Sequence, residues 1–389
     1  MSTTTSVKTA PPDEVLAGQA TAKQNGSQRL LSLDLFRGAT MFFLIGGSTR
    51  LYSHFNTYTG DDTFAGSLAR QFTHHTWNGL YFWDLIQPFF MFIVGVAMVY
   101  SLNKRIQLST SWADINRHMI RRCLILFFLG VLLHCIYRGE IVWELWNVLT
   151  QLGVTIMIAY LIFNYRLRTQ FAISIGLLLA MEILYRSFAV EGFDQPFVRG
   201  ANFGSWMDMV LMGKTSPGGW VAINAIPTAA HTIWGVIAGK ILSSAKVPTD
   251  KIRILAIAGV IGLLVGYGLD WSGITPIIKR ISTSSFVIAS GGWCLLVLAA
   301  CYWLVDVKGY KRIVFFFSVV GMNSIFIYMF SETIGRQWLP GFVSIFTTGL
   351  LQPFGASEAV VNISTGIALW AAGWYLCYWL YQRKVFIKI

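Results

Sequence analysis

Residues 81–102 read YFWDLIQPFFMFIVGVAMVYSL, an apolar stretch in which Asp84 is the only charged side chain. A helix rises ~1.5 Å per residue, so about 20 such residues cross the roughly 30 Å hydrocarbon core of a bilayer. The run is continuous and does not alternate with polar residues, which favours a helix, since a helix satisfies its backbone hydrogen bonds internally in lipid. We therefore expect a transmembrane helix here.

Working outward, similar apolar stretches recur along the chain and predict an all-α, polytopic membrane protein with about ten transmembrane helices. The other stretches cover residues 31–51, 119–138, 142–164, 170–188, 220–242, 254–269, 283–304, 313–334 and 360–381. The proline-bounded apolar run 340–354 is short for a crossing and is expected to be re-entrant or interfacial. Polar residues 1–29 are expected to form a disordered cytoplasmic tail, and residues 30–389 a single transmembrane domain.

The composition of the 389-residue chain excludes an ordinary soluble surface. The chain is 55% hydrophobic and 12% charged, with a mean hydropathy of +0.57, whereas about a quarter of the residues in a soluble protein are charged. The net charge of +12 therefore reports topology rather than nucleic-acid binding, because cytoplasmic loops collect Lys and Arg. These residues concentrate in the alternate segments that share a side with both chain ends, so both termini are expected in the cytoplasm.

Several chemistries are not indicated by the sequence. The five cysteines lie in or beside apolar runs without CxxC spacing, so neither a disulfide framework nor a metal site is expected. The sequence also lacks GxxxxGK[ST] for nucleotides, HExxH for zinc and GxSxG for a serine nucleophile.

The predicted outer loop 52–80 is long and carries residues suited to acid–base chemistry. Loops above about 12–15 residues are usually functional, and this one contains His74, His75 and Asn78 shortly before Asp84. Histidine is the default general base near neutral pH, and anchoring of the helix in the lipid headgroups is an equal alternative. An Asp inside an apolar span costs about 2.5–3.5 kcal/mol at full depth, so Asp84 should have a partner, and orienting a histidine ring is one such role.

Near the cytoplasmic end of the first predicted span, Asp34 and Arg37 lie three residues apart on one helical face. Mutual neutralisation is the favoured interpretation of this pair. The alternative is an anion site in which Arg37 donates to a phosphate that enters from the cytoplasm.

Seven strings spread from residue 29 to the end of the chain occur together in one family of membrane enzymes. They are RLLSLDLFRG at 29–38, HHTWNGLYFWDLIQPFFMFIVG at 74–95, SPGGWVAINAIPTAAHTIWGVIAGKIL at 216–242, PIIKRISTSSFVIASGGW at 276–293, ACYWLVDV at 300–307, GMNSIFIY at 321–328 and YQRKVFIKI at 381–389. In this order they make the chain resemble a bacterial member of the heparan-α-glucosaminide N-acetyltransferase family of transmembrane acyltransferases. Such members move an acetyl group from cytoplasmic acetyl-CoA to an amino sugar across the membrane.

The resemblance also implies site residues. The family's catalytic histidine lies three residues before the Trp of an H-x-x-W-N-G motif, which corresponds to His74 here. Ser48 stands where the family often has an Asn that assists this histidine. Thr150 and Gln151 stand where members commonly show Gln-Arg, at an expected cofactor contact.

From these residues we expect His74 to take the proton of the attacking amine, with Asp84 orienting its ring directly or through Asn78. Asn78 or Ser48 would polarise the thioester carbonyl. An acetyl-histidine intermediate with ping-pong kinetics is the alternative.

Acetyl-CoA is the expected co-substrate, and no metal is expected. Arg37, Lys240 and Arg312 are cytoplasmic-side candidates for its phosphates, chosen by placement, and Gln151 is a further candidate contact. For each of the basic residues, a purely topological role is the alternative.

The expected partners are an amino sugar or glycan acceptor and membrane lipid, without nucleic acid, and a homodimer is left open. The expected location is a bacterial inner membrane. Two rival functions are an amino-sugar transporter, which would carry solute without acetyl-CoA, and an O-acyltransferase that acts on a cell-envelope glycan.

Overall fold

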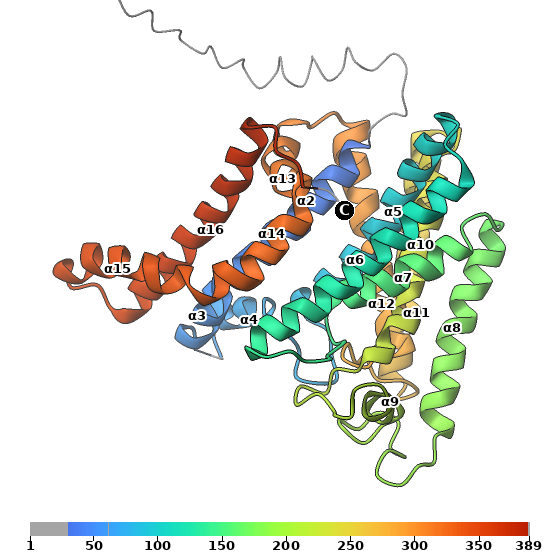
Figure 1. The fold of residues 1–389 in the computed structure, drawn as a ribbon, viewed down its shortest axis with the longest axis horizontal. Coiled ribbons are helices and arrows are strands. Elements are labelled where there is room, and N and C mark those ends of the chain that lie inside the picture. The colour runs from blue at the N-terminus through green and yellow to red at the C-terminus, as the bar shows by residue number, and fades with distance from the viewer. Residues whose placement is uncertain (1–29, 61, 388–389) are drawn as a thin grey trace, which may run out of the picture.

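The computed structural model describes residues 30–60 and 62–387, which form an all-helical bundle (Figure 1). No strand occurs in these two ranges. The predicted all-α class is therefore confirmed. The predicted tail, residues 1–29, lies outside the described residues, and the assignment of 30–389 to a single domain stays a prediction.

The helices fall into long, short and single-turn elements. The long helices are α2 (Leu31–Ser48), α5 (Ile86–Gln107), α6 (Trp112–Arg138), α7 (Val148–Leu161), α8 (Leu167–Ser187), α10 (Ala225–Ser243), α11 (Pro248–Trp271), α12 (Ser284–Cys301) and α16 (Glu358–Gln382). The shorter ones are α3 (Leu51–Tyr58), α4 (Phe64–Arg70), α9 (Phe203–Met212), α13 (Arg312–Met322), α14 (Ser324–Phe330) and α15 (Leu339–Leu351). Tighter or wider turns form η2 (Phe82–Leu85), η3 (Ala222–Asn224), η4 (Tyr302–Val307), η5 (Ser331–Gly335) and η6 (Gln352–Phe354).

Six helical segments in the described residues are long and apolar enough to cross a membrane. They are 82–107, 112–138, 167–187, 248–271, 284–307 and 358–382. The segments 312–322 and 324–335 pass the same test together but bend by 65° at Asn323, which raises the count to at most seven. All ten predicted stretches contain a helix, yet the predicted count of ten crossings is not confirmed.

The helices in the other predicted stretches are too polar or too short to count as membrane crossings, for identifiable reasons. Asp34 and Arg37 lower the hydropathy of α2, and His231 and Lys240 lower that of α10. Helix α7 has only 14 residues. Most of α2 and α10 is buried against other helices rather than lipid, and a helix inside a bundle tolerates polar residues that a lipid-facing helix does not.

Helices α5 and α10 approach each other closely at the centre of the bundle. A Cβ added to Gly95 would lie 2.1 Å from the Thr232 carbonyl oxygen, and one added to Gly235 would lie 2.1 Å from that of Phe92. Small residues allow helix backbones to pack at this distance. The contact fixes α5, whose N-terminal end follows the His74 loop.

One end of the bundle carries α3 and α4, below α2 in Figure 1, and α9, near the bottom of the picture, and we call it the site end. Three chain segments meet there. The Gly79 N–H donates to the Ile277 carbonyl at 2.8 Å, and the Trp77 indole N–H donates to the Phe197 carbonyl at 2.8 Å. The His74 loop is therefore held by the loop after α11 and by the loop before α9.

Helix α15 stands off the bundle beside α16 (Figure 1). It has 13 residues and none of them is buried. This length is too short for a crossing. Its exposure is compatible with the predicted interfacial position of residues 340–354.

Candidate active site

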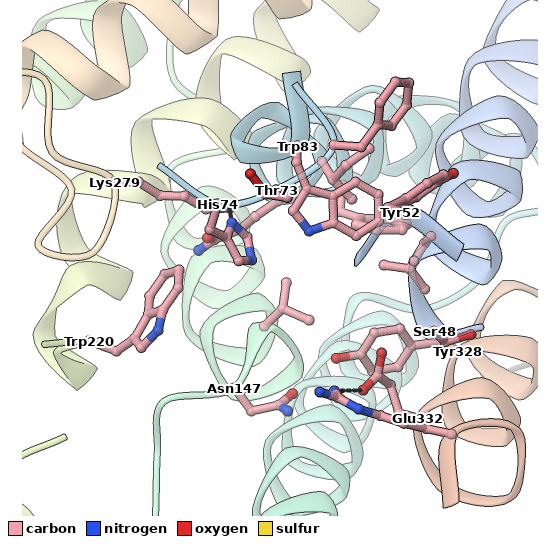
Figure 2. Close-up of a pocket in the computed structure, with 18 of the residues that line it drawn as sticks. Ser48, Tyr52, Thr73, His74, Trp83, Asn147, Trp220, Lys279, Tyr328 and Glu332 are labelled. Atoms are coloured by element: carbon pink, nitrogen blue, oxygen red, sulfur yellow. Dashed lines mark hydrogen bonds and ion pairs between the residues drawn. The ribbon is translucent and has the colours of Figure 1, made fainter. Parts of the chain in front are cut away.

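A cavity of about 720 Å³ opens at the site end, within the usual size range of small-molecule sites. Figure 2 shows His74 and Lys279 on one side and Ser48, Tyr328 and Glu332 on the other. Its polar and aromatic lining includes Ser48, Tyr52, His74, Trp83, Gln87, Trp146, Asn147, Gln151, Trp220, Lys279, Tyr328 and Glu332. The lining thus joins residues from both halves of the chain.

Asp84 fixes the ring of His74. Its Oδ1 lies 2.9 Å from His74 Nδ1, and its Oδ2 accepts the backbone N–H groups of His75 and Tyr81, both at 3.1 Å. Asp84 lies in the first turn of η2. Its side chain is 1% exposed, whereas the side chain of His74 is 40% exposed. Because the Nδ1 edge faces Asp84, the opposite nitrogen, Nε2, is the one that can meet a ligand in the cavity.

Lys279 completes this cluster from a distant part of the chain. Its Nζ lies 3.2 Å from His74 Nδ1 and 3.5 Å from Asp84 Oδ1, and its side chain is 6% exposed. The turn that carries it is braced by bonds from Ser282 N–H to the Lys279 carbonyl and from Ile278 N–H to Thr283 Oγ1, both at 3.0 Å. A buried ammonium is thus held against the imidazole–carboxylate pair.

Sequence reasoning did not single out Lys279. The available signal was a lysine inside the apolar run PIIKRI at 276–281, since a charge flanked by apolar residues tends to be buried and paired.

The charges in this cluster shift the ionisation of His74 and Lys279. Although 40% of the His74 side chain is exposed, its free edge faces the cavity rather than open water, and this desolvation and then the Lys279 ammonium lower the pKa of His74 to about 4, against the opposing effect of Asp84. Burial lowers the pKa of Lys279 to about 8, opposed by the Asp84 carboxylate. At neutral pH His74 is therefore uncharged, while Lys279 is mostly protonated.

Tryptophans form flat walls beside His74. The Trp220 ring meets the His74 ring edge-to-face at 5.5 Å between centroids, and Trp83 lies at 6.4 Å. The Trp146 indole N–H donates to Asp208 Oδ2 at 2.7 Å, and burial raises the pKa of Asp208 to about 6. Such fixed indoles offer apolar faces with one polar edge, which suits a ligand that is apolar on one face and polar around its rim.

Two of the other predicted residues reach the cavity, and one does not. Ser48 and Gln151 line it. The Ser48 hydroxyl donates to the Ile45 carbonyl at 2.7 Å, and Gln151 accepts a hydrogen bond from Gln87 of α5. Asn78 is exposed and lies outside the lining.

The basic residues predicted to hold phosphates lie toward the opposite end of the bundle. Arg37 pairs with Asp34 at 2.9 Å near the start of α2, whose other end reaches the cavity. Lys240 donates to the Phe163 carbonyl and lies 4.6 Å from the centre of the Phe163 ring. Arg312 is exposed at the start of α13. The structure therefore does not bring these three residues to His74.

The fold and the cavity together define a polytopic membrane protein with a histidine, carboxylate and lysine cluster at one end of its bundle. Residues 29–268 match the family model described as "Heparan-alpha-glucosaminide N-acetyltransferase, catalytic". This match covers more than half of the chain, and the protein belongs to that family. The resemblance predicted from the seven strings is thereby confirmed.

Two curated relatives share the sequence over most of this chain. The heparan-alpha-glucosaminide N-acetyltransferase of Mus musculus is 24% identical over 435 residues, which cover 95% of this chain and 62% of the relative. That of Homo sapiens is 25% identical over 425 residues, which cover 93% of this chain and 60% of the relative. The chain thus spans about three fifths of the length of these relatives.

Proposed function

We propose that this protein is a transmembrane acyltransferase that moves an acetyl group from cytoplasmic acetyl-CoA to the amine of an amino sugar at the outer face of the membrane. The observation that carries the proposal is the imidazole of His74, which Asp84 holds at the wall of the cavity. The relatives' names describe N-acetyl transfer to a glucosaminide. Acetyl-CoA is the donor that this chemistry implies.

Topology supports a reaction across the membrane. Acetyl-CoA carries phosphate charges that cannot enter lipid, whereas its pantetheine arm is long and thin. The positive-inside rule assigns the end opposite the cavity to the cytoplasm. The nucleotide would stay there beside Arg37, Lys240 and Arg312, and the arm would pass inward so that the thioester reaches the cavity near Gln151.

In the proposed step the acceptor amine attacks the thioester carbonyl carbon. The lone pair on His74 Nε2 takes the amine proton, and Asp84 stabilises the resulting imidazolium through Nδ1–H. The tetrahedral intermediate then expels the CoA thiolate, which takes up the proton, and the amide remains on the sugar. Ser48 is the donor that we assign to the carbonyl oxygen, because it lines the cavity and Asn78 does not. Its hydroxyl would have to turn from the Ile45 carbonyl, to which it donates at 2.7 Å, toward the substrate.

The same imidazole also suits a covalent route. In that route Nε2 attacks the thioester, CoA leaves, and the amine removes the acetyl group from His74 in a second step. Acetyl-CoA added without acceptor would then leave an acetyl group on His74 that peptide mass spectrometry locates. Direct transfer would leave His74 unmodified.

Radiolabelled acetyl-CoA, a panel of amino sugars and purified protein test the proposal. Wild type and His54→Ala, a histidine on α3, should both form labelled amide, and His74→Ala should not. Full transfer by His74→Ala would overturn the assignment. Sugar flux into vesicles without labelled product would support the transporter, and a labelled ester would support the O-acyltransferase.

A further inference from the structure

The cluster at His74 holds one group that the proposed transfer step leaves without a role. Lys279 approaches the same nitrogen, Nδ1, that faces Asp84, with N···N and N···O distances of 3.2 and 2.9 Å. Because the ionised carboxylate can only accept, Nδ1 is assigned as its donor. A nitrogen that donates its proton to a carboxylate has no lone pair in the ring plane for a second donor. The contact between the ammonium and the imidazole is therefore one of charge.

Several contacts hold Lys279 in this position. Its ammonium is buried, within 3.5 Å of the buried Asp84 carboxylate and 5.6 Å from the centre of the Trp220 ring. Burying an unpaired ammonium would be costly, and the carboxylate partly offsets that cost. The Gly79–Ile277 hydrogen bond ties the two loops together at 2.8 Å, so the approach does not depend on a single side chain.

We propose that Lys279 is a positioning residue that keeps His74 uncharged, so that the lone pair that Asp84 places on Nε2 stays free to face the cavity. A positive charge beside Nδ1 opposes protonation of the ring. Asp84 next to it still selects the tautomer with hydrogen on Nδ1. The two charges thus act on different properties of one imidazole: the cation on its charge, the carboxylate on its orientation. This inference rests on the proposed function for its consequence in transfer.

The other charged groups around His74 do not replace Lys279. Arg280 follows in the same turn and contributes a weaker effect of the same sign. Across the cavity, Glu332 is paired with Arg336 at 3.3 Å, and Arg50 lies at the rim after α2. Lys279 is therefore the charge whose removal should alter His74 most.

The test measures the charge of His74 without requiring transfer. Diethyl pyrocarbonate acylates uncharged imidazole, and mass spectrometry of the purified full chain reports the modification rate constant at His74, corrected for hydrolysis of the reagent. N-acetylhistidine, treated in parallel, shows how the rate of an ordinary imidazole falls as it becomes protonated. In wild type this rate constant at His74 should change little between pH 7.5 and pH 5. In Lys279→Met the rate constant should fall by about tenfold or more over this range, because Asp84, no longer opposed by the ammonium, offsets the burial of the ring and raises its pKa toward the ordinary range.

Two further variants make the result specific. Lys279→Arg keeps the charge and should keep the flat profile, and Arg199→Met removes a cation from the loop before α9 and should also keep it. If Lys279→Met is not monodisperse, Lys279→Gln takes its place. A flat profile in the neutral variant, or a falling one in Lys279→Arg, would overturn the proposal.

The transfer assay separates this inference from the proposed function. If wild type forms no labelled amide but the labelling profiles differ as expected, only the proposed function fails. If transfer occurs and the neutral variant loses activity without a change in labelling profile, the inference about Lys279 fails and the lysine has another role.

Discussion

At the level of single residues, Asp84 is the group on which the other charges of the cavity depend. Its two oxygens contact the His74 ring, the Lys279 ammonium and two backbone N–H groups. A buried carboxylate persists only when its charge is compensated and its lone pairs are used. Both conditions are met here, so the carboxylate is a rigid acceptor rather than a mobile one.

Replacing this carboxylate by an amide should separate its charge from its shape. In Asp84→Asn the amide no longer stabilises a protonated His74, and it can hold the ring in the wrong tautomer. We expect kcat for amide formation to fall by about 10²-fold or more, measured with labelled acetyl-CoA on monodisperse protein. Asp114→Asn, on an exposed site of α6, is the control, and wild-type activity in Asp84→Asn would contradict the role given to the carboxylate.

How far this site could be predicted depended on distance along the chain. His74 and Asp84 lie 10 residues apart, across one loop and the first turn of a helix, so local reasoning placed them together. Lys279 lies 205 residues from His74 and arrives only because the bundle closes. No pattern of spacing in the sequence predicts such a contact. The only signal in the sequence was that Lys279 stands inside an apolar run.

At the level of elements, α9 and the turn after it hold one wall of the cavity. Asp208 on α9 accepts both the Trp146 indole N–H at 2.7 Å and the Ala222 backbone N–H at 2.9 Å. It thus connects α9 to Trp146, two residues before the start of α7, and to the start of η3. Such a bridge fixes the plane of an indole that would otherwise rotate.

If the acceptor stacks on this indole, disturbing its hydrogen bond should weaken acceptor binding more than chemistry. We expect Asp208→Ala and Trp146→Phe each to raise the acceptor KM by about threefold to tenfold, which corresponds to a loss of roughly 0.6–1.4 kcal/mol, with little change in kcat. Because both changes remove the same hydrogen bond, the acceptor KM of the double variant should be no higher than the higher KM of the two single variants. Additive effects would show that Asp208 and Trp146 act separately, and Glu191→Ala, exposed in the loop between α8 and α9, serves as the control.

A second prediction at this level concerns the helix pair that carries the site. The backbones of α5 and α10 touch at Gly95 and Gly235, where an added Cβ meets a carbonyl oxygen at 2.1 Å. Gly235→Val should therefore force the helices apart and cost about 1–3 kcal/mol or more of stability, seen as a lower melting temperature in detergent. Gly268→Val is the control, because nothing lies within 4 Å of a Cβ at that position of α11. Equal melting temperatures for the two variants would contradict the close approach.

At the level of the whole molecule, hydropathy predicted where helices lie better than how many cross. The ten predicted stretches all contain helices, because each is apolar enough to fold in a bundle. Hydropathy cannot separate a short or polar helix enclosed by others, such as α7 or α2, from one that faces lipid. The bend at Asn323 was also missed, since nothing in the run 313–334 marks a 65° change of direction.

The proposed reaction finally requires that the two ends of the bundle face different compartments. The loop with Glu191 lies at the site end between α8 and α9, and the turn with Lys246 joins α10 and α11 at the other end. Both side chains are exposed, so cysteine at either position should be accessible from its own side.

A membrane-impermeant maleimide should label Glu191→Cys in intact cells. It should label Lys246→Cys only after the cells are permeabilised, when the reagent reaches the inner side of the bilayer. The native cysteines lie within helices and are buried or half-buried, so unmodified protein gives the background. Labelling of Lys246→Cys, but not Glu191→Cys, in intact cells would place His74 on the cytoplasmic side, where acetyl-CoA has no membrane to cross and a transmembrane transfer would have no purpose.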